Sequence, residues 1–231
     1  MITRRDLLKV AGAAAAAGAV PPARADGAEV PSLRSYLERD SANLESEDEG
    51  HQAGGPREPL LALTADEHDL LTAIVGRLIP ADATGPGAVE AGAVTYIDRA
   101  LAGPLSGSRD TYRRGLAALE RHARSSRGGP FRELAPTDQD SLLIDVETGA
   151  ATGSGAGFDG SSAAFFALLR AHTWQGTFGD PYYGGNRNFV GWDLIGYPGV
   201  RLAVTPDDQR LGQVPPRLRR SAYDNDQFHR A

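Results

Sequence analysis

W-Q-G-T-F-G-D-P-Y-Y-G-G-N-R-N-F-V-G-W-D-L-I-G-Y-P-G-V, residues 174–200, contains both tryptophans of the chain and a run of glycines and prolines that suits neither a helix nor a strand. Within it, Gly184, Gly185 and Asn186 are consecutive residues that adopt positive φ readily. The stretch therefore predicts a tight, ordered loop with many aromatic side chains. Two interpretations of this loop stay open: it fills the core of its own domain, or it presents its aromatic side chains to a partner.

Before this loop, apolar residues recur at the spacing of an α-helix. Thr64 and Glu67 form the pattern of a capping box at the start of the first helix, and Pro80 ends it. No stretch shows the sustained alternation of apolar and polar residues that marks a half-buried strand. The sequence therefore predicts a mainly α fold: a single helical domain with an ordered aromatic, glycine-rich loop near the C-terminus. The expected helices span about 65–79, 89–102, 108–122, 136–148 and 161–173.

The first 25 residues are expected to be a twin-arginine signal peptide rather than part of the fold. Arg4 and Arg5 precede an apolar region that is short and rich in alanine, and Ala23-Arg24-Ala25 is a cleavage pattern of the A-x-A kind. An uncleaved anchor is the alternative, but the apolar region falls below the usual length of a membrane span. The sequence therefore predicts export to the periplasm.

Three further parts follow the signal peptide. Residues 26–59 are polar and charge-dense, which is typical of a linker or a mobile arm. Residues 60–200 are expected to form the helical domain. Residues 201–231 are rich in arginine, proline and aspartate. They are expected to be an extended tail that lies over a surface of this chain or of a partner, or is disordered.

The composition argues against several kinds of function. The formal net charge is −6, without a basic stripe, so nucleic acid is not an expected partner. The chain has no cysteine, which excludes thiolate-bound metals and iron–sulfur clusters held by this chain. Its histidines are scattered, and neither a nucleophile elbow nor a dinucleotide-binding pattern is present. Asp82, Glu90 and Asp98 lack a positioned partner for acid–base work. We expect no catalytic residue, cofactor or metal in this chain.

Two blocks of sequence point to a known family. D-P-Y-Y-G-G-N at residues 180–186, followed by G-W-D-L-I-G-Y-P-G at 191–199, resembles the signature of the gluconate 2-dehydrogenase subunit 3 family. R-L-I-P-A-D-A-T-G-P-G-A-V-E-A-G-A-V-T-Y-I-D at residues 77–98 is similar to the other block of that family. The resemblance extends from about residue 63 to residue 200 and leaves the tail unsupported.

The resemblance implies a role in a larger assembly. Members of this family are the small subunits of periplasmic flavin-dependent sugar and polyol dehydrogenases. It implies a large flavoprotein dehydrogenase partner that holds FAD, a cytochrome c subunit as a further partner, and membrane association through the complex. The chain itself is then a non-catalytic subunit that supports the folding and the twin-arginine export of the flavoprotein.

Large aromatic residues dominate the energetics of protein interfaces. The expected contact or contact-shaping residues therefore lie in the aromatic loop, although the motif does not say which of them face the partner. The alternative is a stand-alone periplasmic sugar-binding protein, in which the aromatic loop stacks on a sugar and Asp180, Asn186 and Asp193 bind its hydroxyl groups. The residues predicted for the partner interface are Tyr182, Tyr183, Asn186, Trp192 and Tyr197.

Overall fold

The computed structural model describes residues 59–83, 85–151, 157–158, 160–212 and 216–225. The twin-arginine pair and the expected linker, apart from its last residue, lie outside this part of the chain. The described residues contain six α-helices and five short 3-10 helices, and no strand beyond an isolated bridge between Asp82 and Gly85. The predicted mainly α fold is therefore confirmed. No helix in the described ranges has the length and apolarity needed to cross a membrane.

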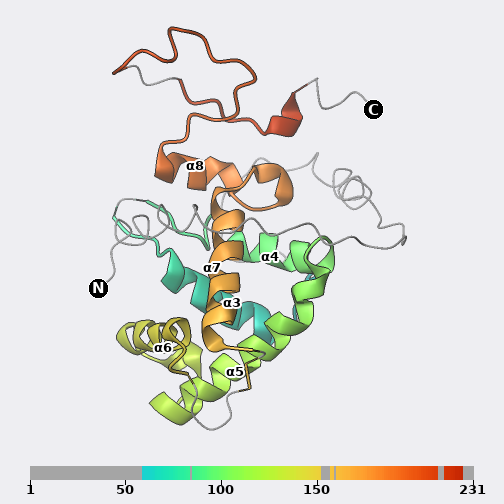
Figure 1. Ribbon diagram of the computed structural model, residues 1–231, viewed down its shortest axis with the longest axis vertical. Helices are drawn as coiled ribbons and strands as arrows, with labels where there is room; N and C mark the ends of the chain where they lie inside the picture. The colour runs from blue at the N-terminus through green and yellow to red at the C-terminus, as the bar shows by residue number, and fades with distance from the viewer. Residues whose placement is uncertain (1–58, 84, 152–156, 159, 213–215, 226–231) are drawn as a thin grey trace. The chain divides into compact units, whose positions relative to one another are not determined.

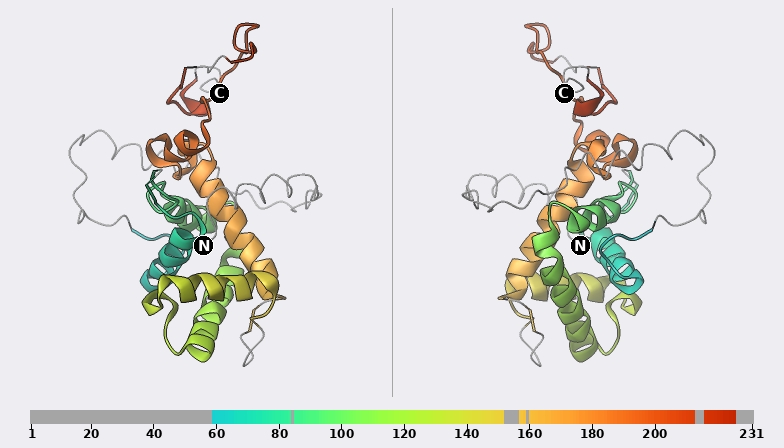
Figure 2. Two further views of the ribbon diagram at one scale, coloured as in Figure 1. Left: turned by 90° about the vertical axis from the view of Figure 1, so that its left-hand side faces the viewer. Right: turned by 90° about the vertical axis from the view of Figure 1, so that its right-hand side faces the viewer.

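Helix α7 (Ser162–Phe178) is the element around which the others pack. Its start is as predicted, because the Ser161 side chain accepts a hydrogen bond from the Ala164 N–H and caps the helix. Figures 1 and 2 show it running from α6 at one end to the short helix α8 at the other, with contacts to both. It buries Phe165, Phe166 and Leu169.

The far end of α7 differs from the prediction. The helix was expected to stop near Thr173, but it continues to Phe178, so the first five residues of the expected aromatic loop are helical. The hydroxyls of Thr173 and Thr177 donate hydrogen bonds to the backbone carbonyls four residues earlier, at 2.8 and 2.7 Å. These bonds satisfy both buried side chains within the helix. The additional turns carry the aromatic motif well clear of the α6 end of the helix.

Helix α3 (Ala65–Leu78) begins with the predicted capping box, in which Thr64 and Glu67 exchange hydrogen bonds. Helix α4 (Ala93–Ala102) begins about four residues later than expected. The reason is Gly92, whose left-handed φ of 76° ends a turn just before the helix. Val89, expected to begin this helix, therefore lies outside it and is 37% exposed.

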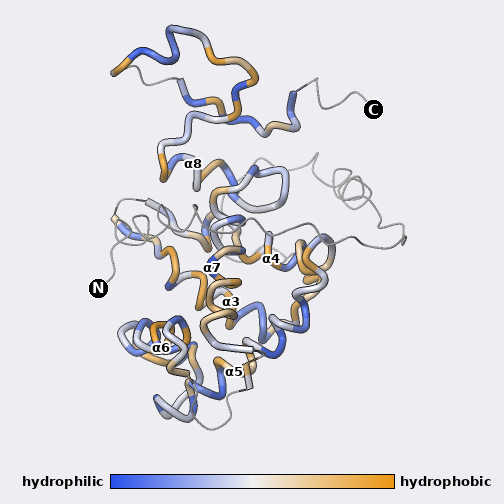
Figure 3. The backbone as a smooth tube through the Cα atoms, viewed as in Figure 1, coloured by the Kyte–Doolittle hydropathy of each residue, from blue (hydrophilic) through white to orange (hydrophobic). Residues whose placement is uncertain are grey.

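Helix α5 (Arg109–Arg127) is longer than predicted, and the Ser108 side chain does not cap it. Helix α6 (Pro136–Thr148) matches its prediction, with Pro136 in the first turn and Gly149 in the left-handed conformation after its end. Ile144 is 43% exposed on this helix. The apolar residues of α3, α6 and α7 gather where these helices meet (Figure 3).

The first described residues are tied to the helices by one buried carboxylate. Asp98 on α4 accepts the backbone N–H groups of Leu61, Ala62 and Leu63 at 2.8, 3.0 and 2.8 Å. Its side chain is only 4% exposed. Three N–H donors satisfy the buried carboxylate, so Asp98 fixes the backbone segment that leads into α3. Its carboxylate is therefore not free for acid–base chemistry.

Candidate partner-binding surface

The aromatic motif, residues 180–199, folds back over the C-terminal end of α7 (Figure 1). It contains the 3-10 helices η4 (Pro181–Tyr183) and η5 (Arg187–Phe189), followed by α8 (Val190–Ile195). Asp180 begins η4 by accepting the Tyr182 N–H at 3.0 Å. The prediction of an entirely non-helical stretch is therefore wrong: its glycines separate short helical turns.

Asn186 is the central hydrogen-bonding residue of the motif and is fully buried. Its side-chain amide donates to the Gly179 carbonyl at 2.8 Å and its Oδ1 accepts the Gly191 N–H at 2.7 Å. Its own backbone N–H donates to the Gly176 carbonyl at 2.7 Å. An asparagine suits this position because its amide both donates and accepts, and because it tolerates the observed φ of 45°.

Two glycines allow the motif to approach α7 closely. A Cβ on Gly185 would overlap the Gly176 carbonyl, and a Cβ on Gly191 would overlap the Thr177 carbonyl. Both obstacles are backbone atoms at the end of a packed helix, which cannot turn away as a flexible side chain can. Glycine is therefore required at positions 185 and 191, because the backbone of the motif lies directly against the backbone of α7 there.

Trp192 anchors the outer part of the motif. Its indole Nε1–H donates to the Phe178 carbonyl at 3.0 Å, which satisfies one acceptor at the end of α7, and the residue is 5% exposed. Tyr197 meets its ring edge to face, with the centroids 4.9 Å apart. Trp192 and Asn186 therefore shape the surface from within.

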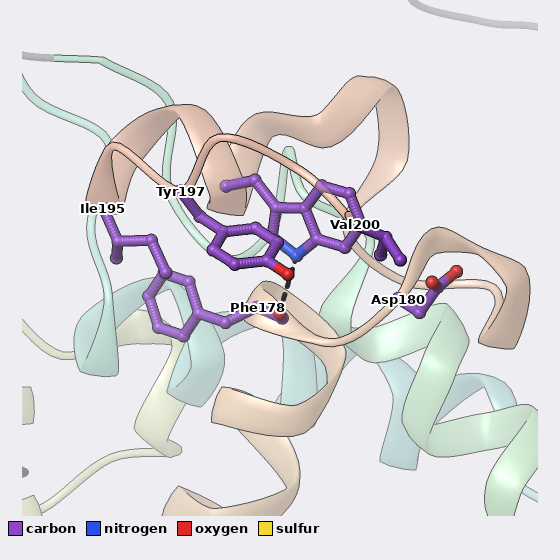
Figure 4. A pocket seen from close by; sticks show the side chains of 6 residues that line it. Phe178, Asp180, Ile195, Tyr197 and Val200 are labelled. Carbon is purple, nitrogen blue, oxygen red and sulfur yellow. Dashed lines mark hydrogen bonds between the residues drawn. The ribbon is translucent and has the colours of Figure 1, made fainter. Parts of the chain in front are cut away.

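The tyrosines supply the outer face. Tyr183 and Tyr197 are each 39% exposed, Tyr182 is half-buried, and Ile195 is 47% exposed. Beside them lies an open pocket of about 400 Å³. Figure 4 shows Phe178 and Ile195 on one side of it and Val200 and Asp180 on the other. The pocket is lined by Phe178, Asp180, Trp192, Ile195, Tyr197 and Val200.

The C-terminal part of the chain lies on this face. Ser221 donates its hydroxyl to Asp180 Oδ1 at 2.5 Å, and the Ala222 N–H donates to Asp180 Oδ2 at 2.8 Å. Tyr223 stacks on Tyr182 with the ring centroids 3.9 Å apart. We refer to residues 216–224 as the tail segment. The tail segment therefore contacts the aromatic motif of its own chain.

Arginines fasten the same segment to α8. Arg217 and Arg219 donate to the two oxygens of Asp193 at 2.7 and 2.5 Å, and the Leu218 N–H donates to the Pro198 carbonyl at 2.7 Å. Between the motif and the tail segment, residues 201–212 project outward (Figures 1 and 3). The apolar residues Leu202, Val204 and Leu211 are exposed there. Arg201, at the start of this projection, donates hydrogen bonds to Asp208 within it and to the Pro216 carbonyl beyond it.

The sequence reasoning missed the residues of the tail segment. A signal was present, because Ser221 and Asp224 have the spacing of a capping box, which they form at the start of η6 (Ala222–Asp224). The long-range partners Asp180 and Asp193 had no signal, since nothing in the spacing joins residues that lie 24 to 42 positions apart.

Two tyrosine hydroxyls meet at the edge of the surface. The hydroxyls of Tyr183 and Tyr223 are 2.6 Å apart. This hydrogen bond, assisted by partial burial and by nearby acidic groups, raises the pKa of Tyr183 to about 12. The Tyr183 ring therefore presents a neutral hydroxyl at physiological pH.

The polar groups that a sugar would need are already engaged. Asn186 is buried, while Asp180 and Asp193 hold the tail segment. The geometry thus gives the sugar-binding alternative no support. Among the described residues, no group of three or more histidine, cysteine, aspartate or glutamate side chains could hold a metal ion.

These features define a helical domain whose aromatic motif is locked onto the end of its central helix and presents a tyrosine-rich face. Comparison with family models gives a match to gluconate 2-dehydrogenase subunit 3 over residues 65–199, and the chain belongs to this family. Residues 1–21, with Arg4 and Arg5, match the signal sequence of the twin-arginine translocation pathway, so the chain carries a signal for export to the periplasm. Searches of curated proteins and of solved structures gave no match.

Proposed function

We propose that this chain is the non-catalytic small subunit of a periplasmic FAD-dependent dehydrogenase of sugars or sugar acids. In this proposal it binds the large flavoprotein subunit before export, supports its folding and takes it through the twin-arginine route. FAD belongs to the flavoprotein, a cytochrome c subunit accepts its electrons, and the complex as a whole associates with the membrane. The family match and the twin-arginine signal support this assignment.

One observation supports the proposal: the buried hydrogen bonds and close backbone contacts of the motif make it rigid. Asn186, Gly185 and Gly191 fix the backbone, and Trp192 fixes the outer turn. What this framework holds in place is a set of tyrosines that are only partly covered. A preformed aromatic face loses little conformational entropy on binding, which is the property a docking surface needs.

We propose that the predicted interface residues divide into two groups. Tyr183 and Tyr197 contact the flavoprotein directly, with Tyr182 at the edge of the contact. Asn186 and Trp192 shape the surface from inside and do not touch the partner. The open pocket beside Tyr197 accepts an apolar side chain of the partner, since aromatic and aliphatic groups form most of its wall.

The test is recovery of the partner with an affinity-tagged chain from the native host. We expect a large yellow protein with FAD and dehydrogenase activity to be recovered with the wild-type chain. Tyr183→Ala combined with Tyr197→Ala should reduce its recovery at least tenfold. The matched control is Ile144→Ala, a similarly exposed apolar residue on α6, which should retain it. A wild-type chain that is recovered alone and colourless would contradict the proposal.

A further inference from the structure

The acceptors and the donors of the tail contacts lie in different parts of the chain. Asp180 and Asp193 are inside the region that matches the family, residues 65–199, whereas every donor from the tail segment is outside it. The outer face is therefore a composite. The family region supplies the tyrosines and two carboxylates, and the tail segment supplies Tyr223 and several arginines.

The tail segment changes the charge of that face. Residues 216–224 carry three arginines, Arg217, Arg219 and Arg220, and one acidic residue, Asp224. Arg217 and Arg219 share one carboxylate, Asp193, so their combined charge exceeds that of the group they bind. Asp180, Asp193 and Asp224 lie on the same face, so its three arginines and three carboxylates balance in number. The arginines are nevertheless the more exposed partners, with the Arg217 and Arg219 side chains 54% and 58% exposed against 29% for Asp193, so positive groups form the outer layer there.

These arginines remain available to another protein. The Arg217 and Arg219 side chains are 54% and 58% exposed even while they bind Asp193, and Arg220 is exposed. Exposed ion pairs contribute little to folding stability. The segment is also attached by the Asp180 contacts, by the ring of Tyr223 and by the Leu218 N–H bond to Pro198, so its attachment does not depend on the arginines alone.

We propose that the tail segment and the exposed tyrosines of the aromatic motif form one docking surface, and that its arginines face an acidic patch on the flavoprotein subunit. This inference rests on the proposed function and names the chemistry of its partner. Tyrosine and arginine are the residues enriched at the centres of protein interfaces, and here they lie next to each other. The exposed tyrosines supply apolar contact area, and the arginines supply orientation and the rate of encounter.

The first test reverses one charge without removing a contact that holds the tail. Association of the full mature chain with the isolated flavoprotein recovered above is measured by surface plasmon resonance at low and high salt. Arg220→Glu should slow association about tenfold at low salt, and the difference should vanish at high salt. The control, Arg113→Glu on an exposed position of α5, makes the same change in net charge and should stay within about twofold of wild type.

The second test uses Tyr223→Ala, which removes the ring on Tyr182 and the hydroxyl on Tyr183. We expect about tenfold weaker binding with an unchanged helical circular dichroism spectrum, because the segment lies outside the helical core. If wild type binds and Arg220→Glu, Arg113→Glu and Tyr223→Ala all bind as wild type does, the composite surface is wrong and the proposed function survives. If wild type itself does not bind, the proposed function fails instead.

Discussion

Tyr223 stacks on Tyr182 with an interplanar angle of 22°, and this contact joins a residue beyond the family-matched region to the family motif. Tyr182 also meets Tyr183 edge to face, with the centroids 5.4 Å apart. The three rings form one cluster in which each tyrosine touches the other two. Aromatic pairs add about 0.5–1.5 kcal/mol beyond their buried area, so the cluster contributes to both the attachment of the tail and the order of the surface.

The cluster leads to a prediction at alkaline pH. The pKa of Tyr183 is about 12 in the folded chain, above its usual value of 10, because of its hydrogen bond to Tyr223. A group whose pKa is raised by folding contributes stability below its unfolded pKa and loses that contribution as the pH rises through the folded value. Stability should therefore fall between about pH 10 and pH 12. Denaturant unfolding of wild type and Tyr183→Phe across this range measures it, and an equal slope in the two proteins would contradict the assignment.

Gly191→Ala tests the contact between the motif and α7. The added methyl group overlaps the Thr177 carbonyl, so either the motif or the end of the helix must move. Overpacking of this kind costs about 1–3 kcal/mol, and we expect the upper half of that range because the obstacle is backbone. The control is Gly107→Ala, where a Cβ meets nothing within 4 Å, and its free energy of unfolding should match wild type. Urea unfolding curves give both values.

Asp98→Asn tests the attachment of the first described residues. The carboxylate accepts three N–H groups, and an amide in its place turns one acceptor into a donor that faces another donor. The loss should be about 2–3 kcal/mol, because hydrogen bonds to a charged acceptor are involved. Asp66→Asn, an exposed carboxylate in the first turn of α3, should cost less than about 1 kcal/mol. Similar losses in the two variants would show that Asp98 has no special role.

The sequence predicted the local features of the fold and missed the long-range ones. The Thr64–Glu67 capping box and the helix boundaries near residues 136, 148 and 161 were predicted correctly, because the residues that start or end a helix act on neighbours within three or four positions. Asn186 shows the limit. Its side chain could be read as a surface group or a sugar ligand, and only the folded chain shows that it lies between Gly179 and Gly191 with no exposure.

The same reasoning explains the two errors around the motif. The helix that ends at Phe178 contains Gly176 and two threonines, residues with weak helical propensity, so the periodicity faded before the helix ended. Packing of these last turns against α4 and the motif stabilises a helical conformation that the intrinsic helix propensity of the residues does not favour. The tail segment had no apolar periodicity at all, because it is attached by carboxylates and rings rather than by a buried stripe.

The export signal gives the last prediction. Replacing Arg4 and Arg5 by lysine keeps the charge but removes the planar guanidinium groups, which lysine does not replace at a recognition site. A receptor reads the twin-arginine signal, so we expect this chain to remain in the cytoplasm. If the chain takes the flavoprotein with it, periplasmic dehydrogenase activity should fall at least tenfold while cytoplasmic activity rises. Lys9→Arg serves as the control and should leave both unchanged. Normal periplasmic activity with this chain retained in the cytoplasm would mean that the flavoprotein is exported without it.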